Sequence, residues 1–266
     1  MINRKFFVLL LSLCTCSPFL GKAQDTCFVK RDSIVHSIGL RYDLSFFDDG
    51  NGDPWHLIST EYTRKSLKTT LITRFNFAQR FGSSAVQAEI DAYPKFDKKT
   101  YAYLNLGYAP NTNLFPVFRS GLSIFRSLPA KFEVEAGARY LKFEAPVLIY
   151  TASVGKYFKK YWFNASTFIS PSSTKISTSF FLKARYYLNE EDFVMILFGN
   201  GLSPDNSVDN TLFNTYLKST RAEVSLRKTI HKKFVLFFSS SFNNQQIKNL
   251  SYIRQYNVTT GIQKNF

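Results

Sequence analysis

The sequence repeats one unit along most of its length: a segment of about ten residues in which apolar and polar side chains alternate, followed by turn residues. In the segment 174–188, for example, Phe180 and Leu182 alternate with Lys183 and Arg185. A period of two residues is that of a β-strand whose two faces meet different environments. The chain is therefore expected to be all-β.

Fourteen segments of this kind follow one another, and no second composition or linker interrupts them. The predicted strands are 33–47, 54–64, 69–82, 84–94, 99–110, 115–127, 130–143, 146–157, 160–170, 174–188, 192–203, 214–228, 232–243 and 250–266. If two of the shorter segments merge, the count falls to twelve. Either number is even, as expected of a bacterial transmembrane barrel.

The turns between these segments are of two alternating kinds. One set is short and mostly contains Lys: "RKSLK", "KFDKK", "SLPAK", "YFKKY", "LNEED" and "TIHKK". The other set, which includes "DDGNGDP", "PNTNL", "SPSST" and "SPDNSVDNT", is rich in Asn, Ser, Pro and Asp and contains longer members. Two unlike rims are expected of an antiparallel up-and-down barrel with short periplasmic turns and longer outer loops. A secreted β-sandwich also alternates apolar and polar residues, and it is the alternative fold.

The composition agrees with a membrane barrel. The chain contains 28 Phe and 15 Tyr but 2 Trp and 2 Met. Aromatic residues suit strands and form the interfacial girdles of membrane barrels. Beyond the N-terminal region, no stretch reaches the roughly 18 consecutive apolar residues of a membrane-spanning helix.

The N-terminal region predicts export. "MINRKFFVLLLSLCTCSPFLGKAQ" has a basic start, an apolar run and small residues at Gly21 and Ala23, the pattern of a cleaved secretory signal peptide. We therefore expect a signal peptide at 1–23 and a barrel domain at 24–266. Cleavage leaves Cys27 as the only cysteine, so no internal disulfide is expected.

The net charge is strongly positive. Removing Arg4, Lys5 and Lys22 with the signal peptide lowers the formal charge from +15 to +12. An exported chain with this charge is expected to meet outer-membrane lipid headgroups, anionic glycans or small polar solutes as partners, rather than nucleic acid.

The last segment, "YNVTTGIQKNF", places Val258, Ile262 and the terminal Phe266 on one face. A terminal strand that ends on Phe resembles the segment that bacterial outer-membrane barrels present to their assembly machinery. We therefore expect Phe266 to be an assembly signal and the barrel-assembly machinery to be a partner. The last strand must also close on the first, near 33–47, because an open edge in lipid leaves backbone groups unpaired.

Several longer stretches resemble the YaiO family of outer-membrane β-barrel proteins: "WHLISTEYTRK", "ITRFNFAQRFG", "QAEIDAYPKF", "YAYLNLGYAPN", "FPVFRSGLSIFRSL", "VEAGARYLKF", "IYTASVGKY", "KARYYLN" and "GNGLSPDN". They cover most of the chain from Trp55 to Asn206. The resemblance implies a barrel in the outer membrane of a Gram-negative envelope. Some relatives carry tetratricopeptide repeats before the barrel and are tied to surface polysaccharide. This sequence has no such repeat, so that scaffold role is not carried over.

The polar face of the strands supplies the candidate site, a charged lumen. The predicted lumen-lining residues are Glu61, Arg74, Arg80, Glu89, Asp91, Arg119, Glu133, Glu135, Arg139, Lys183, Arg185, Arg221, Glu223 and Arg227. Arg74 and Arg80 lie one strand from Glu89 and Asp91, which makes cross-strand ion pairs feasible. These charges form either a channel lining that selects anionic or sugar-like solutes, or a salt-bridge network that closes a narrow lumen.

The sequence does not favour an enzyme. His36, His56 and His231 are scattered, and local spacing positions none of them beside a nucleophile. "GNGLSP" lacks the Lys-Ser/Thr ending and the helix of a phosphate-binding loop, so its glycines are expected to allow close packing or a bulge. One mature cysteine and three separate histidines do not make a metal site. No catalytic residue, cofactor or metal is therefore expected.

The resulting hypothesis is a porin-like outer-membrane barrel: a passive channel, or a barrel associated with surface polysaccharide, with a lumen of mixed charge. The alternative is a structural or anchoring barrel that does not conduct, and an outer-membrane hydrolase ranks third.

Overall fold

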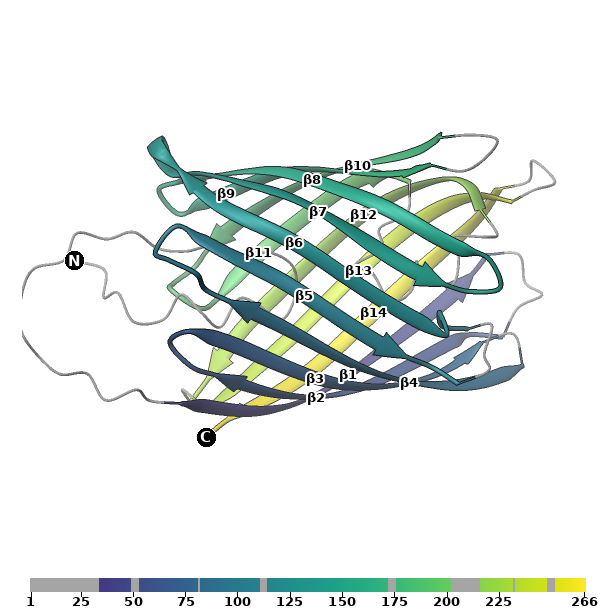
Figure 1. Cartoon of the computed structure of the whole chain (residues 1–266). Coiled ribbons are helices and arrows are strands. Elements are labelled where there is room, and N and C mark those ends of the chain that lie inside the picture. Colours follow the sequence, from purple (N-terminus) through teal and green to yellow (C-terminus); the bar gives the residue numbers. More distant parts are fainter. Residues whose placement is uncertain are drawn as a thin grey trace, which may run out of the picture.

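A computed structural model describes residues 34–48, 53–80, 82–110, 114–171, 176–201, 216–231, 233–247 and 252–266, without the side chains of 216–218 and 247. These residues form fourteen β-strands that close into one antiparallel barrel (Figure 1). The predicted signal peptide and Cys27 lie outside the described residues, and so does the predicted start of the barrel domain.

The strands are β1 (Val35–Phe47), β2 (Trp55–Lys65), β3 (Thr69–Arg80), β4 (Ser83–Pro94), β5 (Thr100–Tyr108), β6 (Phe118–Leu128), β7 (Phe132–Lys142), β8 (Pro146–Phe158), β9 (Tyr161–Pro171), β10 (Ile176–Tyr187), β11 (Phe193–Asn200), β12 (Tyr216–Ile230), β13 (Phe234–Ile247) and β14 (Tyr252–Asn265). Each strand pairs with its sequence neighbours, and β1 pairs with β14. The prediction of fourteen strands is confirmed, and the alternative of twelve is wrong.

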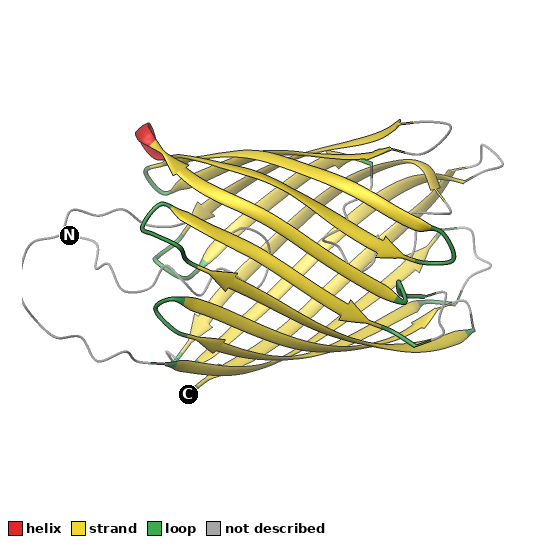
Figure 2. Cartoon of the chain, in the orientation of Figure 1, coloured by secondary structure: helices red, strands yellow, loops and turns green. Residues whose placement is uncertain are grey.

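The two rims of the barrel differ as predicted. The turns that follow the even-numbered strands β2 to β12 are short, and we call their end of the barrel the short-turn rim; it includes 66–68, 95–99, 129–131, 159–160 and 188–192. We call the opposite end the long-loop rim. Figure 2 shows the C-terminal residue at the short-turn rim, together with the three-residue turn η2 (Pro129–Lys131). No helix in the described part of the chain is long and apolar enough to cross a membrane.

The two faces of the strands show that the sandwich alternative is wrong. Large apolar side chains project outward, and Phe75 and Phe198 are 61% and 60% exposed. The inward face instead buries polar and charged side chains, and every Asp and Glu on the described strands is on it. A soluble sandwich would have the reverse arrangement. Apolar outside and polar inside is the pattern of a barrel surrounded by lipid.

One strand boundary that differs from prediction borders the loop between β5 and β6. Residues 115–117 were predicted to begin a strand, but β6 begins at Phe118. Leu114 and Phe115 turn into the barrel mouth, where Phe115 is 1% exposed, and pack with Leu57, Ala78, Ala85 and Ala109. Burial of these apolar groups favours the inward turn over a longer strand.

Strand β13 extends further toward the long-loop rim than predicted. β13 was expected to end at Asn243 and extends to Ile247. Its added inward residue Gln245 is fully buried and donates a hydrogen bond to Gln255 Oε1 on β14, at 3.0 Å. Polar residues that resemble loop chemistry can continue a strand here because the barrel interior is itself polar.

Candidate functional site

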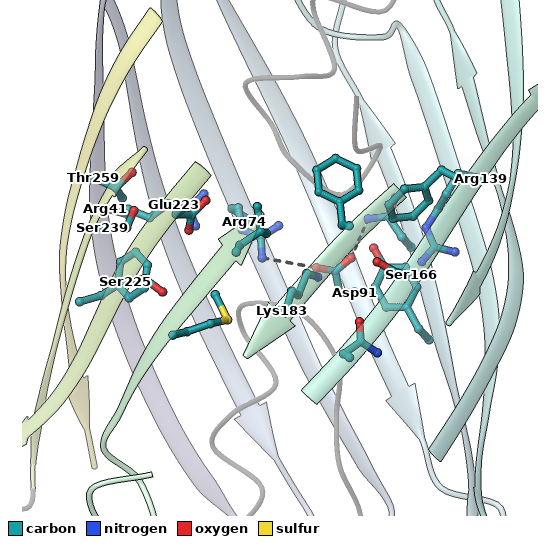
Figure 3. A pocket seen from close by; sticks show the side chains of 18 of the residues that line it. Arg41, Arg74, Asp91, Arg139, Ser166, Lys183, Glu223, Ser225, Ser239 and Thr259 are labelled. Atoms are coloured by element: carbon teal, nitrogen blue, oxygen red, sulfur yellow. Dashed lines mark hydrogen bonds and ion pairs between the residues drawn. The ribbon is translucent and has the colours of Figure 1, made fainter. Parts of the chain in front are cut away.

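The barrel encloses a cavity of about 220 Å³, lined by residues from twelve of its strands (Figure 3). Its two walls differ in chemistry. Strands β3 to β7 contribute mostly charged side chains and their amide partners, and we call this side the charged wall; β9 to β11 contribute mostly aromatic and aliphatic side chains, and we call that side the apolar wall. All fourteen predicted lumen residues lie on the inward face of their strands.

Arg74 is the centre of the charged wall. Strand register places it directly opposite Glu61 on β2 and Glu89 on β4. Its Nη1 donates to Glu89 Oε2 at 2.8 Å, and its Nη2 donates to Glu61 Oε2 at 3.1 Å and to Asp91 Oδ2 at 3.4 Å. The cross-strand ion pairs predicted for Arg74 are therefore present.

The network continues across β5 to β6 through Arg119. Its Nη1 donates to Glu89 Oε1 at 2.7 Å, and its Nε donates to Asn105 Oδ1 at 3.0 Å. This reach over an intervening strand depends on Gly107, because a Cβ at that position would lie 2.6 Å from Arg119 Cγ. The side chains of Glu89 and Arg119 are 4% and 6% exposed, so their charges compensate each other away from water.

A second group of polar contacts lies on β6 to β8. Glu135 accepts hydrogen bonds from Ser123 at 2.8 Å and from Ser153 at 2.9 Å. Arg139 lies 3.7 Å from Glu135 Oε1, and its guanidinium stands over the Tyr103 ring at 4.5 Å. These contacts hold the charged groups against the wall.

Other predicted residues lie elsewhere in the lumen. Arg221 Nη2 donates to Glu223 Oε2 at 2.6 Å on β12, and Arg227 lines a smaller cavity of about 60 Å³ together with Glu61. Glu133 accepts a hydrogen bond from the Tyr101 hydroxyl at 3.3 Å. Arg185 is almost fully buried between the rings of Trp162 and Phe193, with its Cζ 4.8 and 4.2 Å from their centres.

The proposed pairing of Arg80 with Glu89 or Asp91 is not the arrangement found. Register places Arg80 opposite Ser83, at the long-loop end of β3. Its guanidinium lies over the Trp55 ring, 5.4 Å from the ring centre. Glu89 lies six positions beyond Ser83 along β4, which puts its carboxylate out of reach of Arg80.

Sequence reasoning missed one charged pair in the lumen. Arg41 Nε lies 3.3 Å from Asp43 Oδ2 on β1, and Thr259 of β14 donates to Asp43 Oδ1 at 2.6 Å. The alternation in the sequence could have revealed this pair, since Arg41 and Asp43 alternate with the outward Leu40 and Tyr42.

The histidines of β1 and β2 bond to tyrosine on the outer face. His36 Nδ1 forms a hydrogen bond with the Tyr62 hydroxyl, and His56 Nδ1 with the Tyr42 hydroxyl, both at 2.6 Å. Neither contact is the Ser or Asp pairing that a hydrolase would require. Within the described ranges, no group of three or more His, Cys, Asp or Glu is arranged to hold a metal ion.

Comparison with known proteins identifies the family of this barrel. The model of the YaiO membrane β-barrel domain matches residues 35–206. Among curated protein sequences, none matches the chain.

Two of the solved structures that match this chain show the shared fold at low sequence identity. The Acinetobacter baumannii outer membrane protein Omp33 is 10% identical, with a TM-score of 0.53 over 87% of this chain and 99% of that one. The CymD monoaromatic hydrocarbon channel is 9% identical, with a TM-score of 0.55 over 88% and 89% of the two chains. The family match spans more than half of the sequence and agrees with the barrel observed. The chain belongs to the YaiO membrane β-barrel family and is an outer-membrane protein.

Proposed function

We propose that this barrel is a passive outer-membrane pore for small polar solutes, with a lumen of mixed charge. The proposal rests on which strands the ion pairs of the lumen connect. Inside the described barrel, each pair joins residues of one strand or of strands at most two apart: Arg41–Asp43, Arg74–Glu61, Arg74–Glu89, Arg74–Asp91, Arg119–Glu89, Arg139–Glu135 and Arg221–Glu223.

Among the described residues, pairs of this kind run along the wall and do not bridge the space between the walls. A network that closed the lumen would instead join charges on opposite walls. The charges therefore satisfy one another at the wall, as buried charges must, while the cavity of about 220 Å³ stays between them.

Conductance tests the proposal. Purified barrel is reconstituted into planar lipid bilayers, and single-channel current in potassium chloride is recorded. Wild type is expected to give discrete steps. Ser239→Trp fills the cavity from β13 and is expected to reduce the step size, whereas Ser240→Trp, one residue along and outward-facing, is expected to leave it unchanged.

A folded wild-type barrel that gives no current would overturn the pore and favour the structural, non-conducting barrel. Equal conductance in both tryptophan variants would show that current does not pass through this cavity.

Association with a polysaccharide is a second candidate, favoured by the inner wall of β13 and β14. This wall is lined by uncharged amide and hydroxyl side chains, which suit sugar hydroxyls: Ser239, Ser241, Asn243, Gln245, Gln255, Asn257, Thr259 and Gln263. Block of the current by oligogalacturonate, with neutral maltohexaose for comparison, tests this candidate. Weakened block in Asn257→Ala would support it, and no block by either sugar would exclude it.

A further inference from the structure

We propose that the apolar wall of the lumen holds a binding site for an amphipathic anion, a carboxylate that carries an aromatic or short aliphatic body. The site is centred on Lys183. The inference rests on the proposed pore in that it names a class of solute, but the binding itself can be measured without any current.

Lys183 differs from the arginines of the charged wall. It lies on β10, seven places from β3 in the ring of fourteen strands, and so on the opposite side of the barrel from Arg74. Its register partners are Asn164 on β9 and Leu197 on β11, neither of which is acidic. Among the described residues, no carboxylate lies within ion-pair distance of Lys183, although it lines the cavity (Figure 3).

Unsatisfied polar atoms stand beside this ammonium group. Ser166 Oγ and Asn164 Oδ1 belong to cavity-lining side chains that are each 5% exposed, and neither atom has a hydrogen-bond partner in the described structure. Both residues lie on β9, directly or diagonally across from Lys183. A bound carboxylate would accept hydrogen bonds from Lys183 and Ser166, and Asn164 Oδ1 would accept one from a hydroxyl group on the solute.

The surrounding surface is apolar. Phe168 and Phe181 meet edge to face with ring centres 5.8 Å apart, and Leu197 packs against them. The Phe181 ring lies over Gly199, where a Cβ would collide with it. The absence of a side chain at Gly199, the first residue of "GNGLSP", therefore leaves room for the Phe181 ring of this wall. Aromatic surface of this kind binds an apolar body, and a few polar groups then fix its orientation.

A second cation strengthens the positive potential at this site. Arg185 follows two residues along β10, on the same inward face as Lys183. The Trp162 and Phe193 rings cover its guanidinium. Arg185 therefore adds positive charge near the site but is not expected to contact the solute directly. The cavity-lining carboxylates of the charged wall, which are Glu89, Asp91 and Glu135, are in contact with Arg74, Arg119 or Arg139. These contacts limit their repulsion of an anion at Lys183.

The test uses the full barrel, folded in a non-ionic detergent, with para-fluorobenzoate as the probe followed by fluorine NMR. Wild type is expected to bind it, and Lys183→Gln about tenfold more weakly, the loss of one hydrogen bond to a charged group. Lys183→Arg is expected to retain binding, and Ser166→Ala to weaken it. Lys98→Gln makes the same charge change in an exposed turn and is expected to bind as wild type. Heat-modifiability confirms that each variant is folded.

para-Fluorobenzyl alcohol has the same ring without the charge, and its signal is expected not to depend on Lys183. Equal binding of para-fluorobenzoate to wild type and Lys183→Gln, or no binding to folded wild type, would overturn the inference. The two proposals can fail separately. Conductance without binding would overturn the binding site but not the pore, and binding without conductance would overturn the pore but not the binding site.

Discussion

The backbone amide of Phe266 donates a hydrogen bond to the carbonyl of His36 at 2.9 Å, and the His36 amide donates to the Phe266 carbonyl at 3.1 Å. The last residue of the chain is thus paired with the start of β1. The two rings also stack, with centres 6.2 Å apart, on the outer face at the short-turn rim. The residue that we expect to signal assembly therefore also completes the seam that closes the barrel.

Deletion of Phe266 is expected to lower the amount of folded barrel in the outer membrane. A strand that assembly machinery recognises by strand addition needs apolar anchors on one face, and Phe266 lies on the same face as Val258 and Ile262. Heat-modifiability on gels of outer-membrane fractions measures the result. Phe266→Tyr keeps the ring and is the control. Normal levels of the truncated chain, with altered conductance instead, would contradict the assembly role.

Glu89→Gln is expected to destabilise the barrel and to make its lumen more anion-selective. The Glu89 carboxylate lies between Arg74 and Arg119, and removing one partner of a buried ion pair costs about 3–5 kcal/mol. Urea unfolding in lipid vesicles and the reversal potential in a salt gradient measure the two effects. Glu144→Gln, in a loop of the long-loop rim, is the matched control. Unchanged stability and selectivity would show that the network is dispensable.

The turn between β10 and β11 is expected to make stability depend on pH. Although burial opposes the charge of Asp192, its carboxylate accepts hydrogen bonds from Lys228 at 2.8 Å, from the Thr229 amide at 2.7 Å and from Asn189 at 2.8 Å, and these hold its pKa below the ordinary value. The stability that they add is therefore complete above the pKa of an unfolded Asp, about 4. It is lost as the pH falls through the lower pKa of the folded state.

Asp192→Asn is accordingly expected to unfold more easily at neutral pH, by about 1–3 kcal/mol for the lost charged hydrogen bonds. The difference from wild type should shrink below about pH 4. Urea unfolding followed by tryptophan fluorescence at several pH values checks this, with Glu190→Gln in the same turn as the control. A difference that stays constant down to the acid limit would exclude the carboxylate as its cause.

Outward-facing cations form a collar just inside the short-turn rim, which faces the periplasm in a barrel of this kind. The basic collar consists of residues one or two positions before the end of an even-numbered strand: Arg64, Arg126, Lys156, Lys228 and Lys264. Lys156 Nζ lies 4.3 Å from the centre of the Phe132 ring, which places the charge beside lipid-facing aromatic side chains. We expect the collar to contact phosphate headgroups.

Anionic lipid is therefore expected to stabilise the barrel, by about 1 kcal/mol for each collar residue. Unfolding in vesicles that contain phosphatidylglycerol is compared with unfolding in phosphatidylcholine alone. The variant Arg126→Gln, Lys156→Gln, Lys264→Gln should lose the difference between the two lipids. Lys68→Gln, Lys98→Gln, Lys99→Gln removes the same charge from the turns and should keep it. An equal loss in both triple variants would indicate net charge rather than the collar.

Much of the lumen could be predicted because hairpin neighbours are also sequence neighbours. A pleated strand sends alternate side chains to opposite faces, so Arg74, Glu89 and Asp91 had to share one side. The short turns then set the register that brings Arg74 opposite Glu89. The same reasoning gave a wrong partner for Arg80, because knowing that two strands are neighbours does not say how far along each strand a residue lies. Arg80 lies at the end of β3, where its guanidinium stacks over the Trp55 ring.

The number of strands, their faces, the two kinds of rim and the closed architecture could be predicted from the sequence alone, because each follows from local periodicity and from the need to pair every backbone group in lipid. Which side chains meet across non-adjacent strands depends on the tertiary structure. Arg119 reaches Glu89 because Gly107 leaves the space above β5 empty, and Phe115 leaves its strand to fill the mouth. Lys183 lies apart from the carboxylates because ring closure carries β10 to the side opposite β3, a consequence that no local pattern contains.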